Sequence, residues 1–234
     1  MNIVVTGASR GIGFALVKKL SEKENHRVIA IARSQEALHR LEKECQNPTR
    51  EKRVFPFPFD LVEGDYENLV QEAQKRLGGK VDVLINNAGA LVKKPVRQLA
   101  LDDFDMMFGV NMKAPFLLSK YFLPFMEKGS HIVNISSMAG YPGSLKFPGM
   151  TLYSASKGAL GAFTEALSAE LQPMGVAVNC LAIGAVETKM MRQAFPEADA
   201  PVQAHEMAAY IAEFALEGNK MFNGKVLPVA VTTP

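Results

Sequence analysis

The sequence has no tryptophan, only two cysteines, no long apolar run and no block of charge of one sign. Cys45 and Cys180 are far apart and have no cysteine or histidine companion at metal-ligand spacing. We therefore interpret both as free, buried thiols in a reducing compartment. The four histidines form no HxxxH or histidine–carboxylate cluster, so we expect no metal site.

Two kinds of segment are also missing. No apolar stretch reaches the roughly 18 residues of a membrane-spanning helix, and the amino terminus lacks the basic region, apolar region and cleavage site of a signal peptide. The 26 basic and 24 acidic residues are spread along the chain and leave a net charge of +2. We expect a cytoplasmic protein that binds neither nucleic acid nor a membrane.

What is present is the composition of an ordinary globular protein. The chain has 234 residues, of which 48% are hydrophobic and 21% are charged. No linker, low-complexity tract or repeat divides it. The sequence therefore predicts one domain over residues 1–234, large enough to fold without a disulfide or a metal.

Short β-branched runs alternate with amphipathic segments. The runs predict strands at residues 3–6, 28–31, 54–57, 81–85, 131–135, 176–181 and 226–231. Helical periodicity is found in residues 14–24, 36–45, 66–77, 102–128 and 154–171. This alternation is typical of an α/β fold, a doubly wound parallel sheet of about seven strands with helices on both faces.

Two segments, 138–151 and 189–203, have little periodicity. Both follow predicted strands, at the carboxyl ends where such folds bind ligands. We predict that they wall a substrate pocket. The apolar residues that could face the substrate are Met138, Tyr141, Phe147, Met150, Met190 and Met191.

A glycine-rich turn, "TGASRGIG" at residues 6–13, follows the first strand and leads into a helix. Gly7, Gly11 and Gly13 let the backbone turn sharply and leave its amides open to a pyrophosphate. The helix amino terminus adds N–H donors and a partial positive charge. By spacing alone, G-x-x-x-G-x-G could also be a plain tight turn.

The choice of nucleotide depends on the second strand, "RVIAIARS". A 2′-hydroxyl is usually met by a carboxylate near that point and a 2′-phosphate by arginine. No carboxylate ends this strand, Arg33 follows it, and Arg10 lies in the glycine turn. The two guanidinium groups favour NADP over NAD, although both could also be solvated surface residues.

Tyr153 and Lys157 lie four positions apart in "TLYSASKG", residues 151–158. On a helix they share a face. An ammonium beside a phenol would lower the phenol pKa from about 10 and suit it to reversible proton transfer. The pair taken alone could equally be a solvated face.

Six motifs occur in order along the chain. They are "TGASRGIG", Asp60, "NNAG" at residues 86–89, Asn111, "NISS" at residues 134–137 and "YSASK" at residues 153–157. Together they resemble the classical short-chain dehydrogenases/reductases over nearly the whole chain. The resemblance implies a Rossmann-type fold and an NADP(H)-dependent oxidoreductase.

The resemblance also implies site residues. The catalytic group would be Asn111, Ser137, Tyr153 and Lys157, and the nucleotide would be held by Gly7, Ser9, Arg10, Gly11, Ile12, Gly13, Arg33, Asp60, Leu61, Asn87, Ala88, Gly89, Tyr153, Lys157, Val186 and Thr188.

Within this group the roles differ. Asp60 and Leu61 would meet the adenine, and Val186 and Thr188 the nicotinamide. Tyr153 would donate the proton, Lys157 would also hold the nicotinamide ribose, and Ser137 would bind the substrate oxygen, with Ser136 as the competing choice. Asn111 would hold a water or simply bond local helix backbone.

Three features depart from the family pattern. Ile183 replaces the usual proline, the interval from Ser137 to Tyr153 is longer than in typical members, and the carboxyl end "GKVLPVAVTTP" lacks an acidic-glycine ending. None changes the four catalytic candidates. The replacement of proline gives the loop an N–H donor and more freedom.

We expect reduction of a ketone or aldehyde by NADPH. A non-catalytic NADP-binding sensor or scaffold of the same fold is the alternative, although it would be expected to lose Tyr153 or Lys157. A nucleotide-sugar isomerase or dehydratase would usually be longer. The helix at residues 152–171 is rich in small residues, and the family pairs such helices, so we expect a homodimer or homotetramer.

Overall fold

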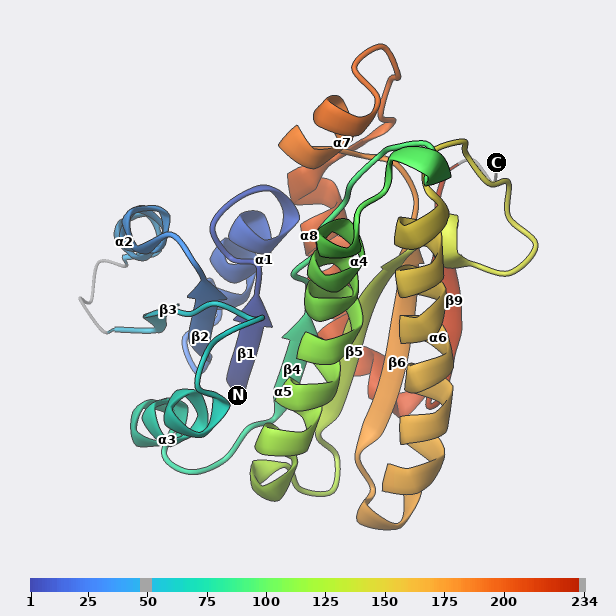
Figure 1. Cartoon of the computed structure of the whole chain (residues 1–234). Coiled ribbons are helices and arrows are strands. Elements are labelled where there is room, and N and C mark those ends of the chain that lie inside the picture. Colours follow the sequence, from blue (N-terminus) through green and yellow to red (C-terminus); the bar gives the residue numbers. More distant parts are fainter. Residues whose placement is uncertain (47–51, 232–234) are drawn as a thin grey trace.

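The computed structural model describes residues 1–46 and 52–231, and its centre is a parallel seven-stranded sheet (Figure 1). The strand order is β3-β2-β1-β4-β5-β6-β9. The bounds are β1 Asn2–Thr6, β2 Arg27–Ala32, β3 Val54–Pro58, β4 Val83–Asn86, β5 His131–Ser137, β6 Ala177–Ile183 and β9 Val226–Val229. All seven predicted strands are in this sheet, so the predicted doubly wound architecture is confirmed.

Helices cover both faces of the sheet (Figure 1). The first face carries α1 Gly11–Ser21, α2 Gln35–Glu44 and α8 Ala204–Glu217. The second carries α3 Tyr66–Leu77, α5 Ala114–Phe122 and α6 Thr151–Leu171. Across the described ranges, no helix is long and apolar enough to span a membrane.

The strands are buried on both faces because successive side chains point to opposite layers. In β1, Val4 packs into the layer of α3 and α5, whereas Ile3 and Val5 pack into that of α1 and α8. All three are fully buried. Each such side chain stabilises the fold by roughly 1.5–3 kcal/mol, which explains the near absence of charge in the strand segments.

The predicted helix at 102–128 is in fact interrupted. It consists of α4 Leu101–Phe108, a π-helical turn Gly109–Lys113, α5 and a 3-10 turn Leu123–Phe125. Pro115 has no N–H to donate to the carbonyl of residue 111, so a regular α-helical ladder cannot continue there. The wider turn places Asn111 on the inside of the molecule.

The carboxyl-terminal third contains elements that the strand and helix predictions did not include. The segment 189–203 contains a short helix, α7 Lys189–Ala194, and is bracketed by the paired strands β7 Val186–Glu187 and β8 Val202–Gln203. Helix α8 follows directly. Its apolar residues recur at helical spacing and are buried, so its periodicity was available in the sequence.

The two cysteines are free thiols, as expected. Cys180 is buried in β6, whereas Cys45 is only half-buried at the end of α2. Burial raises the pKa of Cys180 to about 11, so its thiol stays neutral at pH 7.

Candidate functional site

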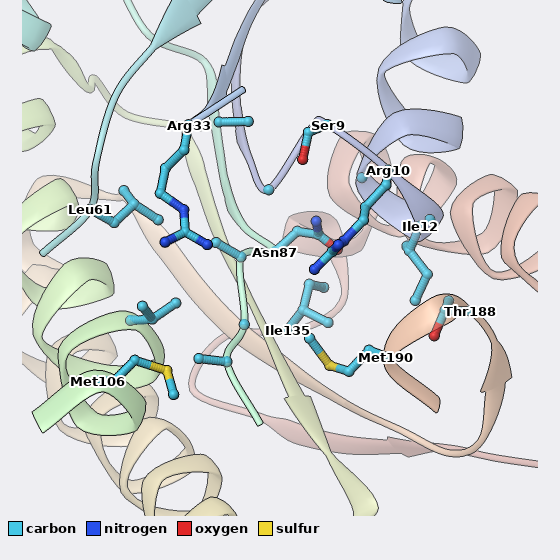
Figure 2. A pocket seen from close by; sticks show the side chains of 18 of the residues that line it. Ser9, Arg10, Ile12, Arg33, Leu61, Asn87, Met106, Ile135, Thr188 and Met190 are labelled. Atoms are coloured by element: carbon cyan, nitrogen blue, oxygen red, sulfur yellow. The ribbon is translucent and has the colours of Figure 1, made fainter. Parts of the chain in front are cut away.

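A cavity of about 360 Å³ opens at the carboxyl ends of the strands, where β1 and β4 lie side by side and the strand order reverses (Figure 2). Connections from β1 and β4 leave toward opposite ends of the sheet at this point, so their loops separate and leave a crevice. The segments that follow β1, β2, β3 and β4 all contribute to its lining.

The glycine turn forms one wall of this cavity. Gly7 and Gly11 have positive φ angles of 71° and 57°, which favour glycine. A Cβ on Gly13 would lie 2.3 Å from the Gly7 carbonyl oxygen and 2.5 Å from Asn87 Nδ2. The turn therefore closes tightly on itself and presents backbone, rather than side chains, at the start of α1.

Thr6 joins this turn to the segment after β4. Its Oγ1 accepts hydrogen bonds from the Asn87 N–H at 3.1 Å and the Ala88 N–H at 3.0 Å. Asn87 Nδ2 donates to the Thr6 carbonyl oxygen at 2.9 Å. The "NNAG" segment is thus fixed against the glycine turn, and both line the cavity.

Two arginines make the cavity electropositive. Figure 2 shows Arg10 and Arg33 on either side of Asn87, both lining the cavity. Neither guanidinium has an ion-pair partner within residues 1–46 and 52–231. Asp60 also lines the cavity, with its Oδ1 accepting from the Val62 N–H at 2.8 Å. Two free guanidinium groups suit a phosphate-bearing ligand.

Lys157 extends from α6 to the edge of β5. Its Nζ is buried and donates to the Ile135 carbonyl oxygen at 2.7 Å. A Cβ on Gly89 would lie 3.6 Å from this ammonium. Burial lowers the pKa of Lys157 to about 8, and the nearby Cys180 opposes that shift.

Tyr153 lies one helical turn earlier, lines the same cavity and is 8% exposed. Burial raises the pKa of its phenol, and a hydrogen bond with the Ser137 side chain opposes that rise. The sequence predicts that Lys157 lowers this pKa. In the structure the pKa is raised instead, because burial outweighs the hydrogen bond with Ser137, so the phenol stays protonated at neutral pH.

Ser136 and Ser137 have different surroundings. Ser136 is buried and its Oγ donates to the Lys157 carbonyl oxygen at 2.8 Å, which ties α6 to β5. Ser137 Oγ accepts from the Ala139 N–H at 3.2 Å and interacts with Tyr153. The Ser137 hydroxyl is therefore the one beside the phenol.

Asn111 is fully buried in the π-helical turn. Its Oδ1 accepts from the Ala90 N–H at 2.8 Å, while its Nδ2 donates to the Ala90 carbonyl oxygen and to Ser156 Oγ, both at 2.9 Å. It bonds neither local helix backbone nor Lys157. It instead fixes the loop after β4 to α6, and a Cβ on Gly89 would lie 3.6 Å from its Oδ1.

Most predicted nucleotide contacts lie together around the cavity. Its lining includes Gly7, Ser9, Arg10, Gly11, Ile12, Gly13, Arg33, Asp60, Leu61, Asn87, Ala88, Gly89, Tyr153, Lys157 and Thr188. Asn111, Ser137 and Val186 do not line it. Val186 is buried in β7 among core residues, whereas Asn111 and Ser137 contact residues at its edge.

Some of the apolar residues that were predicted to face the substrate lie at the cavity or beside Tyr153. Met190 lines the cavity, and Met150 is buried against Tyr153. Phe147 contacts Phe195 edge-on, with ring centroids 5.7 Å apart. The sequence predicted a pocket wall over residues 189–203 without singling out Phe195, and it gave no signal for the segment 91–94, because neither belongs to a recognisable motif. The described residues hold no group of three or more side chains that could bind a metal ion.

A family model described as short chain dehydrogenase matches residues 1–199. An uncharacterized oxidoreductase of Staphylococcus aureus (strain MRSA252) is 32% identical over 188 residues, which are 79% of this chain and 78% of that protein.

Solved structures agree with this match. A short chain dehydrogenase from Burkholderia cenocepacia J2315, in complex with NADP, superposes with a TM-score of 0.86 at 29% identity, over 97% of this chain and 95% of that one. A blue fluorescent protein from a metagenomic library, in complex with NADPH, gives a TM-score of 0.84 at 28% identity, over 98% and 96%.

Proposed function

Because the chain belongs to the short-chain dehydrogenase/reductase family of oxidoreductases, we propose that it uses NADP(H) to interconvert a carbonyl group and an alcohol. One observation carries the proposal. Tyr153 and Lys157 line the same cavity as the glycine turn and two arginines that have no ion-pair partner in the described part of the chain. Proton donor and phosphate-binding groups therefore face one space.

The residues present fit a dinucleotide. Gly7 and Gly13 leave no room for side chains where the backbone turns, so the amides at the start of α1 stay open to a pyrophosphate. Arg10 and Arg33 supply the charge that a 2′-phosphate needs. Asp60 and Leu61 would hold the adenine end, and Asn87 to Gly89 and Thr188 the remainder. When bound, NADPH supplies a hydride.

The chain's own residues supply the proton. Tyr153 is protonated at neutral pH, since an ordinary tyrosine has a pKa of about 10 and burial raises that of Tyr153 further, so its hydroxyl can donate to the oxygen of a carbonyl that becomes an alcohol. Ser137, beside it, donates a hydrogen bond to that oxygen as negative charge develops. Lys157 stabilises the phenolate that remains, and its pKa of about 8 lets it keep its charge at neutral pH.

Asn111 has a positioning role in this proposal. It holds Ala90 and Ser156 in place, of which Ala90 directly follows Gly89 and Ser156 directly precedes Lys157 along the chain. A rigid site of this kind keeps reacting groups aligned. Val186, which the family resemblance places at the nicotinamide, would act through backbone because its side chain is buried elsewhere.

The cofactor preference is tested by measuring oxidation of NADPH and NADH with a panel of ketones, aldehydes, quinones and acyl thioesters. We expect turnover with NADPH. Arg33→Gln should raise the KM for NADPH by about tenfold, because a charge-assisted hydrogen bond contributes roughly 1.5–3 kcal/mol, and should leave the KM for NADH unchanged.

Arg97→Gln is the matched control, since Arg97 is exposed and lies outside the cavity. An NADH preference in the unmodified protein would overturn the roles given to Arg10 and Arg33. Tight NADPH binding with no turnover of any compound would favour the alternative, a non-catalytic NADP-binding sensor or scaffold. We further propose a cytoplasmic enzyme acting on small molecules.

A further inference from the structure

We propose that Lys93 is a positioning residue that holds Phe195 and the end of α7 beside Tyr153, so that the site selects a carbonyl compound with an apolar substituent. This inference rests on the proposed reductase function and names the substrate class for it. Four sets of contacts support it, from three segments that are remote in sequence.

The first set joins Lys93 to α7. Its Nζ donates to the Ala194 carbonyl oxygen at 2.9 Å, at the last residue of the helix. The same ammonium lies 3.8 Å from the centroid of the Phe195 ring. A cation suits both partners, since carbonyls at a helix end carry partial negative charge and the face of an aromatic ring is electron-rich.

The second set joins Lys93 to the segment before α6. Gly149 has a φ of +83°, and a Cβ there would lie 3.2 Å from Lys93 Cγ. The aliphatic stem of Lys93 therefore packs against this glycine. The Lys94 N–H donates to the Gly149 carbonyl oxygen at 3.1 Å, so the two segments are also paired through their backbones.

The third set anchors the segment 91–94 itself. Lys94 Nζ forms an ion pair of 2.8 Å with Asp103 Oδ2 in the first turn of α4. The Asp103 side chain is only 13% exposed. Lys93 thus extends from a fixed base, and the end of α7 is the part that it positions.

The fourth set of contacts brings these segments together beside Tyr153. The rings of Phe147 and Phe195 meet edge-on at 69°, and Phe195 packs against the apolar cluster that contains Tyr153. Segments 91–94, 147–150 and 194–195 therefore meet beside the proposed proton donor. The remaining members of the cluster are Met107, Ala139, Met150, Leu91, Val92, Leu99 and Leu152.

The apolar residues around Tyr153 determine which class of substrate the site favours. A carboxylate or phosphate placed in the cluster would lose its hydration, and the Lys93 ammonium is already bound to Ala194 and Phe195. An alkyl or aryl group would instead gain contact with Met150 and Phe195. The geometry favours ketones or aldehydes that carry such a group next to the carbonyl.

Limited proteolysis tests the positioning role without any need for activity. Trypsin can cut α7 after Lys189 or Arg192. The rate of cleavage in a folded chain depends on how often the cleaved segment opens. We expect Lys93→Met to raise the rate of cleavage there on the order of tenfold, since it removes a charge-assisted hydrogen bond and a cation–π contact. Lys93→Arg, which keeps the cation, should stay near the unmodified rate.

Arg97→Met is the matched control, an exposed cation four residues further along the chain, in the 3-10 turn Val96–Gln98 and outside the cavity lining. If Lys93→Met and Arg97→Met are cut at the same rate, the positioning role is wrong. Fragment masses identify the cleaved bond.

Kinetics test the substrate class. With a phenyl ketone, Lys93→Met should raise the KM by about five- to tenfold with little change in kcat, whereas Lys93→Arg should keep the KM of the unmodified protein. With acetone, Lys93→Met should leave the KM nearly unchanged. An equal rise for both ketones would overturn the selection of apolar substituents. If the unmodified protein reduces no carbonyl compound but Lys93→Met is still cut faster, the reductase proposal fails and the positioning role stands.

Discussion

At the scale of single residues, two neighbouring serines show how local bonding assigns chemistry. Ser136 donates to the Lys157 carbonyl oxygen and is buried, whereas Ser137 interacts with the Tyr153 phenol. The "NISS" motif in the sequence could not separate them, because both side chains are hydroxyls at the end of one strand. Their bonding partners separate them, since Ser136 lines the cavity and bonds α6, whereas Ser137 lies outside that lining and interacts with Tyr153.

Replacing Tyr153 with phenylalanine should remove the proton donor with little change in shape. We expect kcat for carbonyl reduction to fall by at least about 100-fold, with the dissociation constant for NADPH changed less than about threefold. Tyr121→Phe is the control, since Tyr121 lies in α5 and stacks on Tyr66 away from the cavity. Full turnover by Tyr153→Phe would contradict the proposed acid.

His131 should make stability depend on pH. Burial lowers its pKa from 6.5 to about 4, so the unfolded chain takes up a proton that the folded protein does not. The contribution of His131 to stability is fully present above pH 6.5 and is lost as the pH falls toward 4. The loss reaches about 2 kcal/mol by pH 5.

Urea unfolding at pH 7 and pH 5 measures this effect. His131→Gln should lose less stability than the unmodified protein between these two values, whereas His39→Gln, at an exposed site on α2, should behave as the unmodified protein does. Equal losses in all three proteins would show that His131 does not titrate in this way.

At the scale of elements, the π-helical turn Gly109–Lys113 is the feature that sequence periodicity could not reveal. The apolar pattern of residues 102–128 runs through it, so one helix was predicted where the structure has four pieces. The strands were easier to locate, because burial on both faces demands β-branched and apolar residues. The turns proposed to bind the nucleotide were predicted from motif spacing, whereas the contacts of Phe195 and Lys93 could not be, since their partners come from segments remote in sequence.

Asn111→Ala should destabilise the protein. It leaves the Ala90 N–H and carbonyl oxygen without their side-chain partner, and an unsatisfied buried group costs about 1–3 kcal/mol. We expect a loss of about 3 kcal/mol in the free energy of unfolding, measured in urea, and a weaker affinity for NADPH. Asn68→Ala, exposed in α3, is the control. An unchanged stability would mean that the buried amide is dispensable.

At the scale of the whole molecule, α5 and α6 present an apolar surface. Phe116 is 44% exposed and contacts Phe163 edge-on. The small residues Ala155, Ala162 and Ala166 are exposed along α6. This surface permits the close helix approach that the sequence analysis expected for a homodimer or homotetramer.

Phe116→Glu should therefore shift the protein toward the monomer, because a charge would be buried in a paired interface. Sedimentation equilibrium over a range of concentrations would measure the change. Phe222→Glu alters another exposed phenylalanine at 38% exposure, outside α5 and α6. An oligomer that survives the first substitution and dissociates with the second would place the interface elsewhere.

The bonds between Thr6 and residues 87–88 have a consequence for synthesis. They join two segments about 81 residues apart in the chain, and β1 pairs with β4 across a similar interval. At roughly 5–20 residues per second on the ribosome, β1 is made about 4–16 s before its partner. During that interval one edge of β1 has no strand to pair with, so the nascent amino-terminal segment alone cannot fix the glycine turn against residues 87–88.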